Sequence, residues 1–289
     1  MKRTITLLVS LLVLTALLLS GCQQQGQAIP SDPVEAVKLI IDKQKDIKTQ
    51  HTALDLKLAL KVDGLPSDDP SAAFLKNFKA SAQLEGDQDN ATSDFSLKGT
   101  ADLGVLTAFL SQGAEKLEFE LVKVGETLYS RLADQDWNET PISTTGAGSQ
   151  ASPADIAKLT EQMRDLLKKA AKAERLGDEQ VSGVDTYHFK VTLDAIELIS
   201  GFAAIAEETG GEAIPADQLD QVNGLLKDTD MILEMWVGKA DLYIRKTAFQ
   251  MTLDLKNIPD APGVTMFLDL GLTVTNSKLN EPVTIAKPK

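Results

Sequence analysis

The 289-residue sequence contains one cysteine, two histidines and a single long apolar run. One thiol cannot form a disulfide within the chain, so stability must come from an ordinary hydrophobic core. Without a second cysteine or an H-E-x-x-H pattern, the sequence offers no transition-metal site. Basic residues are also scarce, since 29 Lys and Arg face 42 Asp and Glu and the formal net charge is −13. Phosphate backbones repel such a chain, which argues against nucleic acid as a partner.

The familiar catalytic patterns are missing too. No G-x-S-x-G elbow is present, and no carboxylate pair stands out among the 42 acidic residues. Gly146–Ala151 reads G-x-G-x-x-A, but a dinucleotide site needs a buried strand directly before it, and Asn138–Ile142 is polar and contains Pro141. We therefore interpret Gly146–Ala151 as a loop. The sequence predicts neither an enzyme nor a cofactor.

The one apolar run lies at the N-terminus. Met1-Lys2-Arg3 is positively charged, and Ile5–Leu19 is apolar over about 15 residues, which suits a signal peptide and is shorter than the roughly 20 of a membrane span. Leu19-Ser20-Gly21-Cys22 follows and resembles a lipobox. In that pattern the cysteine is diacylated on sulfur and becomes the mature N-terminus. An ordinary secretory signal followed by an incidental thiol is the alternative.

These features predict three regions: a removed signal peptide at 1–21, a lipidated Cys22 with a flexible tether at 22–31, and one folded domain at 32–289. Cleavage leaves 27 basic and 42 acidic residues, so charge does not hold the mature chain to anionic lipid. Acyl groups on Cys22, palmitate for example, would anchor it. We expect an extracytoplasmic location on the outer face of the cytoplasmic membrane, or on an outer membrane in a host that has one.

Most of the remaining sequence alternates between apolar and polar residues, as in strands with one buried face. Leucines alternate with polar residues or alanine over His51–Val62. The same pattern recurs at Asp94–Lys98, Lys116–Leu121, His188–Leu193, Phe249–Lys256 and from about Thr265 to Thr275. Turn signals occur at Glu85–Asn90, Val124–Glu126, Ser182–Asp185 and Val237–Lys239. About ten or eleven strands in successive hairpins predict one antiparallel sheet that must curl.

Helical patterns occur in three places. Asp32-Pro33-Val34-Glu35 is a capped helix start, and the helix is expected to continue to about Thr49. A second helix is predicted after Ser152, and a third helical segment runs from about Ala195 to Leu226 with a break at Gly210-Gly211. We expect the last two to lie across the concave side of the sheet. Six basic residues are assigned to the second helix and its end, as a solvated face or a contact for anionic headgroups: Lys158, Arg164, Lys168, Lys169, Lys172 and Arg175.

Together, the lipobox, the capped helix, the strand at His51–Val62, and the segments Val124–Tyr129, Gly183–Phe189 and Val237–Arg245 resemble the LppX/LprAFG lipoproteins of the LolA-like superfamily. The resemblance implies an α+β fold: a single strongly curved antiparallel half-barrel of about 10–11 strands, with helices packed on its concave face. It also implies a hydrophobic cavity that holds acyl chains of lipids or glycolipids for transport, without catalytic residues.

On this interpretation the apolar residues of the strands and of the third helical segment would line the cavity. The candidates are Leu56, Leu58, Leu60, Phe95, Leu97, Phe119, Leu121, Phe189, Val191, Phe202, Ile205, Trp236, Phe249, Met251 and Leu253. The expected partners are the membrane, through lipidated Cys22, a lipid or glycolipid cargo, and an envelope protein. The alternative is a sensor or protein-interaction module of the same fold, in which these side chains fill a closed core.

Overall fold

The computed structural model describes residues 27–66, 72–104, 107, 116–142, 165, 168, 171–194, 196, 200, 224, 226, 229–256 and 263–289. The predicted signal peptide and Cys22 lie outside these residues, as do most of the second helix and of the third helical segment.

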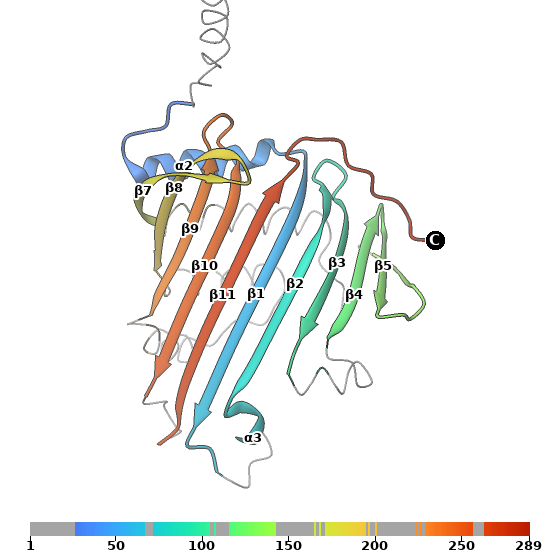
Figure 1. Ribbon diagram of the computed structural model, residues 1–289, viewed down its shortest axis with the longest axis vertical. Coiled ribbons are helices and arrows are strands. Elements are labelled where there is room, and N and C mark those ends of the chain that lie inside the picture. The colour runs from blue at the N-terminus through green and yellow to red at the C-terminus, as the bar shows by residue number, and fades with distance from the viewer. Residues whose placement is uncertain are drawn as a thin grey trace, which may run out of the picture.

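The described chain forms one antiparallel sheet of eleven strands in the order β6-β5-β4-β3-β2-β1-β11-β10-β9-β8-β7 (Figure 1). Neighbouring strands of the sheet are consecutive in the chain everywhere except at the centre, where β1 pairs with β11. The strands are β1 (Thr49–Asp63), β2 (Phe78–Asp89), β3 (Asp94–Asp102), β4 (Leu117–Val124), β5 (Thr127–Leu132), β6 (Asn138–Pro141), β7 (Ala171–Val181), β8 (Val184–Asp194), β9 (Asp230–Gly238), β10 (Ile244–Leu255) and β11 (Thr265–Ser277). Because β6 and β7 are free edges, the sheet is an open curved half-barrel, which confirms the predicted architecture.

Helix α2 (Pro33–Lys43) begins as predicted. The Asp32 carboxylate accepts hydrogen bonds from the backbone N–H groups of Val34 and Glu35, at 2.8 and 3.1 Å, and Pro33 takes the first turn. The helix ends earlier than predicted, because a short 3-10 turn, η1 (Gln44–Asp46), replaces its last turn before β1 starts.

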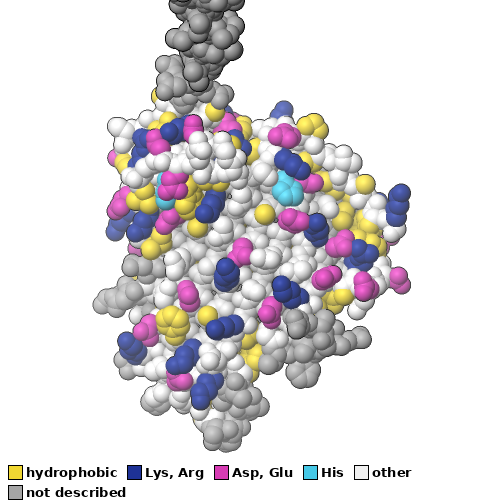
Figure 2. All heavy atoms as spheres, in the orientation of Figure 1, with side chains coloured by type: hydrophobic (Ala, Val, Ile, Leu, Met, Phe, Trp, Pro, Cys, Tyr) yellow, Lys and Arg dark blue, Asp and Glu magenta, His cyan; other side chains and the backbone are white. Residues whose placement is uncertain are grey.

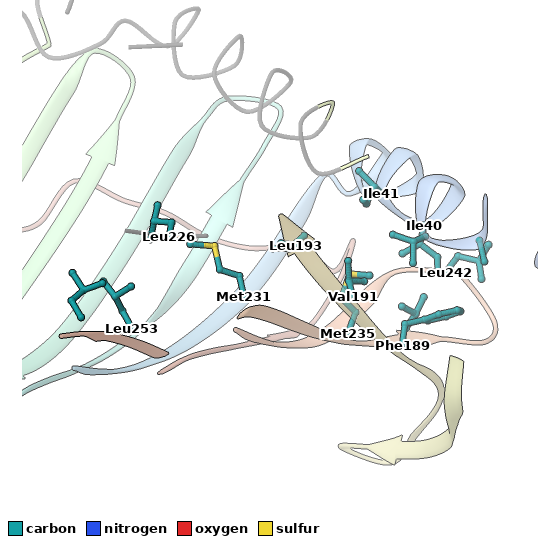
Figure 3. Packing of buried hydrophobic residues seen from close by; sticks show 14 residues of the cluster. Ile40, Ile41, Phe189, Val191, Leu193, Leu226, Met231, Met235, Leu242 and Leu253 are labelled. Atoms are coloured by element: carbon teal, nitrogen blue, oxygen red, sulfur yellow. The ribbon is translucent and has the colours of Figure 1, made fainter. Parts of the chain in front are cut away.

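One face of α2 packs on the sheet. Ala36, Val37, Ile40 and Ile41 are buried, and they join a core with Phe189, Val191, Met235 and Leu242 (Figure 3). Helix α2 therefore covers one end of the strands β8 to β10 (Figure 1).

The side chain of Gln44 fastens the end of α2 to the turn between β9 and β10. Its Nε2 donates to the carbonyl oxygens of Ile40 and Leu242, at 2.6 and 3.0 Å, and its Oε1 accepts from the N–H of Ile244 at 2.9 Å. These bonds satisfy backbone groups at a helix end and at a strand start that would otherwise lack partners.

Two predictions about local structure are wrong. Lys172 and Arg175 were assigned to the second helix and its end, but they belong to strand β7, which pairs with β8 from Ala171 onward. The turn expected at Glu85–Asn90 lies later, because β2 continues to Asp89. Gly86 sits inside β2, where a Cβ atom would come within 1.9 Å of the Ser96 carbonyl oxygen. The glycine thus permits close approach of two strands and does not form the turn.

Candidate lipid-binding face

The register of the sheet places its apolar residues on one face. Leu58 of β1 pairs with Leu270 of β11, which pairs with Met251 of β10, and Met251 pairs with Met231 of β9. Directly paired residues of antiparallel strands point to the same side of a sheet. We call the side that carries these four residues the apolar face and the other side the polar face.

Twelve of the fifteen predicted candidates share the apolar face, although they come from five strands. They are Leu56, Leu58 and Leu60 on β1, Phe95 and Leu97 on β3, Phe119 and Leu121 on β4, Phe189 and Val191 on β8, and Phe249, Met251 and Leu253 on β10. The tertiary structure thus brings together residues that lie up to about 200 positions apart in the sequence.

One candidate does not join this set, and the structure does not describe two others or the predicted lipidation site. Trp236 pairs with His188 and lies on the polar face, because Met235 next to it takes the apolar side. Strand β9 carries apolar residues on both faces, so the sequence pattern does not reveal which side Trp236 takes. Phe202, Ile205 and Cys22 lie outside the described residues.

The apolar face is unevenly covered. Over β8 to β10, close to α2, Phe189, Val191 and Met235 are at most 2% exposed. On β1 and the strands beyond it, the apolar residues are only partly buried, including Leu56, Leu58 and Phe119. The first region is a dry protein core. The second leaves apolar surface that a ligand could cover.

The sequence analysis did not identify several residues of the apolar face. Leu233, Leu268, Leu270 and Leu272 occupy it through their pairing with candidate residues on β8, β10 and β1. Alternation within β11 is a signal that could have identified the last three. Leu233 could not have been assigned by alternation, since Ile232 beside it is also apolar.

The polar face has two hollows of about 530 and 570 Å³ over the central strands. Their walls mix both signs of charge: Asp55, Glu85, Lys98 and Glu120 line the first, and Lys57, Lys79 and Asp269 the second. Figure 2 shows this mixture of Lys and Arg with Asp and Glu over the sheet. The Lys98 ammonium lies 2.8 Å from Glu85, so the charges partly neutralise one another. Neither hollow suits an acyl chain.

A buried polar cluster lies on the polar face between β7, β8 and β9. His188 is 6% exposed, with Nδ1 3.0 Å from Glu179 Oε1 and Nε2 2.9 Å from Glu234 Oε2. The indole Nε1 of Trp236 donates to Glu179 Oε2 at 2.8 Å. This hydrogen bond, and next the one from His188, lower the pKa of the Glu179 carboxyl below its usual value. The cluster links β7, β8 and β9, at one edge of the sheet, on the polar face.

In the described part of the chain, no group of three or more His, Cys, Asp or Glu residues is arranged to hold a metal ion. None of the helices described there is long and apolar enough to cross a membrane.

The fold and the uneven covering of its apolar face define a class of protein: an open antiparallel half-barrel with a partly exposed hydrophobic face. The chain is similar to the lipoprotein LppX from Mycobacterium tuberculosis, with 13% identity and a TM-score of 0.39 over 87% of this chain and 98% of that one. It is similar to LprF from Mycobacterium bovis, with 13% identity and a TM-score of 0.40 over 89% and 99%. A putative outer membrane lipoprotein-sorting protein domain from Vibrio parahaemolyticus has 11% identity and a TM-score of 0.24 over 87% and 94%.

The lipoprotein LppX and LprF bear the names of the group that the sequence resembles. No family model and no curated protein matches the sequence. Since the TM-scores are below 0.5, the function is argued from this chain's own residues.

Proposed function

We propose that the protein is an extracytoplasmic lipoprotein that binds acyl chains of a lipid or glycolipid along its apolar face and carries them between membranes or leaflets. The observation that carries this proposal is the collection of twelve candidate residues, separated in the sequence, on one face of the sheet. Nine of the twelve are only partly buried. No covalent chemistry is involved, and the protein acts by binding and release.

The physical driving force is hydrophobic. Each methylene that moves from water onto this face stabilises the complex by about 0.8 kcal/mol. Two acyl chains supply more than the cost of immobilising one lipid, which is on the order of 4–15 kcal/mol. Leu56, Leu58 and Phe119 lose their remaining exposure in the complex.

Membrane attachment is assigned to Cys22. It follows a short apolar signal and a small residue, Gly21, and it is the only cysteine of the chain. Two or three acyl groups give stable anchoring, whereas one would be marginal. The net negative charge prevents adsorption of the whole surface on anionic lipid, so the anchor sets where the protein resides.

The alternative is a sensor or protein-interaction module of the same fold with no cargo. The dry core between α2 and β8 to β10 favours it in that region, where side chains fill the space completely. The partly buried residues on β1 and β4 favour the carrier.

Native mass spectrometry of a soluble form beginning at Gln23, with extraction and analysis of bound lipid, tests the carrier. A bound mass that extracts as one lipid class is expected. A ligand-free mass that persists after incubation with lipids of the host would overturn the proposal in favour of the interaction module.

Leu58 and Lys57 offer a matched pair for the same measurement. They are neighbours on β1, and Leu58 points to the apolar face while Lys57 is exposed on the polar face. Leu58→Gln places an unpaired amide against the acyl chain at a cost of about 1–3 kcal/mol, so lipid occupancy should fall roughly ten-fold or more. Lys57→Gln should leave the occupancy unchanged. Equal occupancy in both variants would contradict lipid binding on this face.

A further inference from the structure

The part of the chain that the structure describes begins close to the predicted anchor, at Gln27. The backbone N–H of Gln27 donates to the carbonyl oxygen of Lys239 at 2.7 Å, and the Tyr187 hydroxyl donates to the carbonyl oxygen of Gln27 at 3.3 Å. Two residues later, Ile29 packs against the core. The chain is thus attached to the domain five residues before Asp32, where the sequence analysis expected the folded region to begin.

Ion pairs and a cation–ring contact stabilise the site to which Gln27 attaches. The Lys239 ammonium lies 2.7 Å from Asp178, and the Arg175 guanidinium lies 2.8 Å from the same carboxylate. Arg175 also lies over the ring of Tyr187, 4.7 Å from its centroid. Backbone and side-chain contacts therefore hold Gln27 against the turn that follows β9 and against β8.

Only four residues, Gln23 to Gly26, separate Cys22 from Gln27. Even fully extended, the five steps between their Cα atoms span no more than about 18 Å. Strand β1 has 15 residues and is about 50 Å long. A lipid on Cys22 therefore keeps this end of the sheet within about 18 Å of the bilayer and sets no such limit for the other end.

That end is made of Gln27, the β7–β8 turn (182–183), the β9–β10 turn (239–243) and α2, and we call it the anchored end (Figure 1). The residues from Pro33 to Lys48 there contain four lysines and three acidic residues, which contrasts with the strong negative charge of the whole chain. Leu39 of α2 is 39% exposed. An anionic bilayer repels this segment less than the chain average predicts.

The opposite, distal end differs in connectivity. Strands β1, β3 and β8 end there in Asp63, Asp102 and Asp194. Residues 195–229, which contain the candidates Phe202 and Ile205, also connect β8 to β9 at that end, since Asp194 pairs with Asp230.

We propose that the anchored end faces the bilayer that holds Cys22 and that the distal end points into the aqueous space. The inference rests on the lipid anchor of the proposed function. Since α2 covers the apolar face over β8 to β10 at the anchored end, cargo does not pass to the protein's own membrane through that part of the end. It enters and leaves on the side of β1 to β5 or at the distal end.

The experiment uses full-length lipidated protein in vesicles of phosphatidylcholine and phosphatidylglycerol that carry a headgroup nitroxide. Because acylation blocks Cys22, one introduced cysteine accepts a single fluorophore. Ala240→Cys labels the exposed tip of the β9–β10 turn, and Lys61→Cys labels the exposed distal part of β1. We expect quenching several-fold stronger at residue 240 than at residue 61.

A flexible insertion of about 20 Gly and Ser residues after Gly26 is the control, because it adds an average reach of roughly 25 Å. It should weaken the quenching at residue 240. Equal quenching at both sites, or no effect of the insertion, would overturn the orientation. Protein that does not bind the vesicles would overturn the orientation, because it would show that Cys22 carries no lipid anchor. Cargo binding is tested separately, by native mass spectrometry, so the two proposals can fail independently.

Discussion

The imidazole of His188 and the indole of Trp236 lie stacked, with ring centroids 4.2 Å apart and ring planes 17° from parallel. The two residues pair directly across β8 and β9 on the polar face. Lys246 lies over the Trp236 ring, with its ammonium 4.2 Å from the ring centroid. With Glu179 of β7, aromatic, cationic and carboxylate groups therefore join four strands here, on the side of the sheet opposite the proposed cargo.

Trp236→Phe tests whether this cluster stabilises the fold without contacting the cargo. Phenylalanine keeps an aromatic ring but loses the N–H that donates to Glu179, so the free energy of unfolding should fall by about 1–2 kcal/mol in a denaturant titration. Lipid occupancy measured by native mass spectrometry should equal that of the original protein. A folded Trp236→Phe protein that loses its lipid would show that the indole contacts the cargo.

The acid sensitivity of the fold should depend on Glu179. Its pKa is lower in the folded protein than the usual value of 4.5, first because Trp236 donates to it and then because of His188. Its contribution to stability is therefore complete above about pH 4.5 and is lost as the pH falls through the folded pKa. Glu179→Gln should flatten the decrease in Tm between about pH 5 and 3. Glu174→Gln, which removes a carboxylate from the same strand, should preserve the original decrease.

Phe189→Ala should destabilise the domain strongly. The Phe189 side chain is 0% exposed and belongs to the core with Ile40, Val191 and Met235. Removing a buried aromatic ring leaves a cavity and costs about 3–5 kcal/mol, measured by chemical denaturation followed by circular dichroism. Thr192→Ala, on the polar face of the same strand, should change stability by less than about 1 kcal/mol. Similar losses in the two variants would contradict the assignment of faces.

Gln44→Ala should loosen α2 from the β9–β10 turn. The change removes three hydrogen bonds, two to carbonyl oxygens and one from the Ile244 N–H, and should cost about 2–3 kcal/mol. The amide of Ile244 should exchange with deuterium faster than in the original protein. Lys45→Ala, at the exposed neighbouring position, should change neither quantity. Unchanged exchange at Ile244 in Gln44→Ala would show that α2 is held by its apolar contacts alone.

The sequence by itself determined the start of α2 and the sides of five strands, β1, β3, β4, β8 and β10. Alternation over His51–Val62 places Leu56 and Leu58 on one side of β1 without any tertiary information, because successive side chains of a strand point to opposite faces. The Asp32 cap and Pro33 likewise define where α2 begins, since both act within the first helical turn. Successive hairpins also indicate the antiparallel sheet.

Only the tertiary structure decided how those strands share one face and where it is covered. The pairing of β1 with β11 joins segments more than 200 residues apart, and no local pattern encodes which strands become neighbours. Trp236 was misplaced because β9 is apolar on both sides, so only its pairing with His188 defines its face. The end of α2 and the attachment of Gln27 likewise depend on contacts with the β9–β10 turn, which lies about 200 residues further along the chain. Because such contacts form only between folded elements, local sequence periodicity does not predict them.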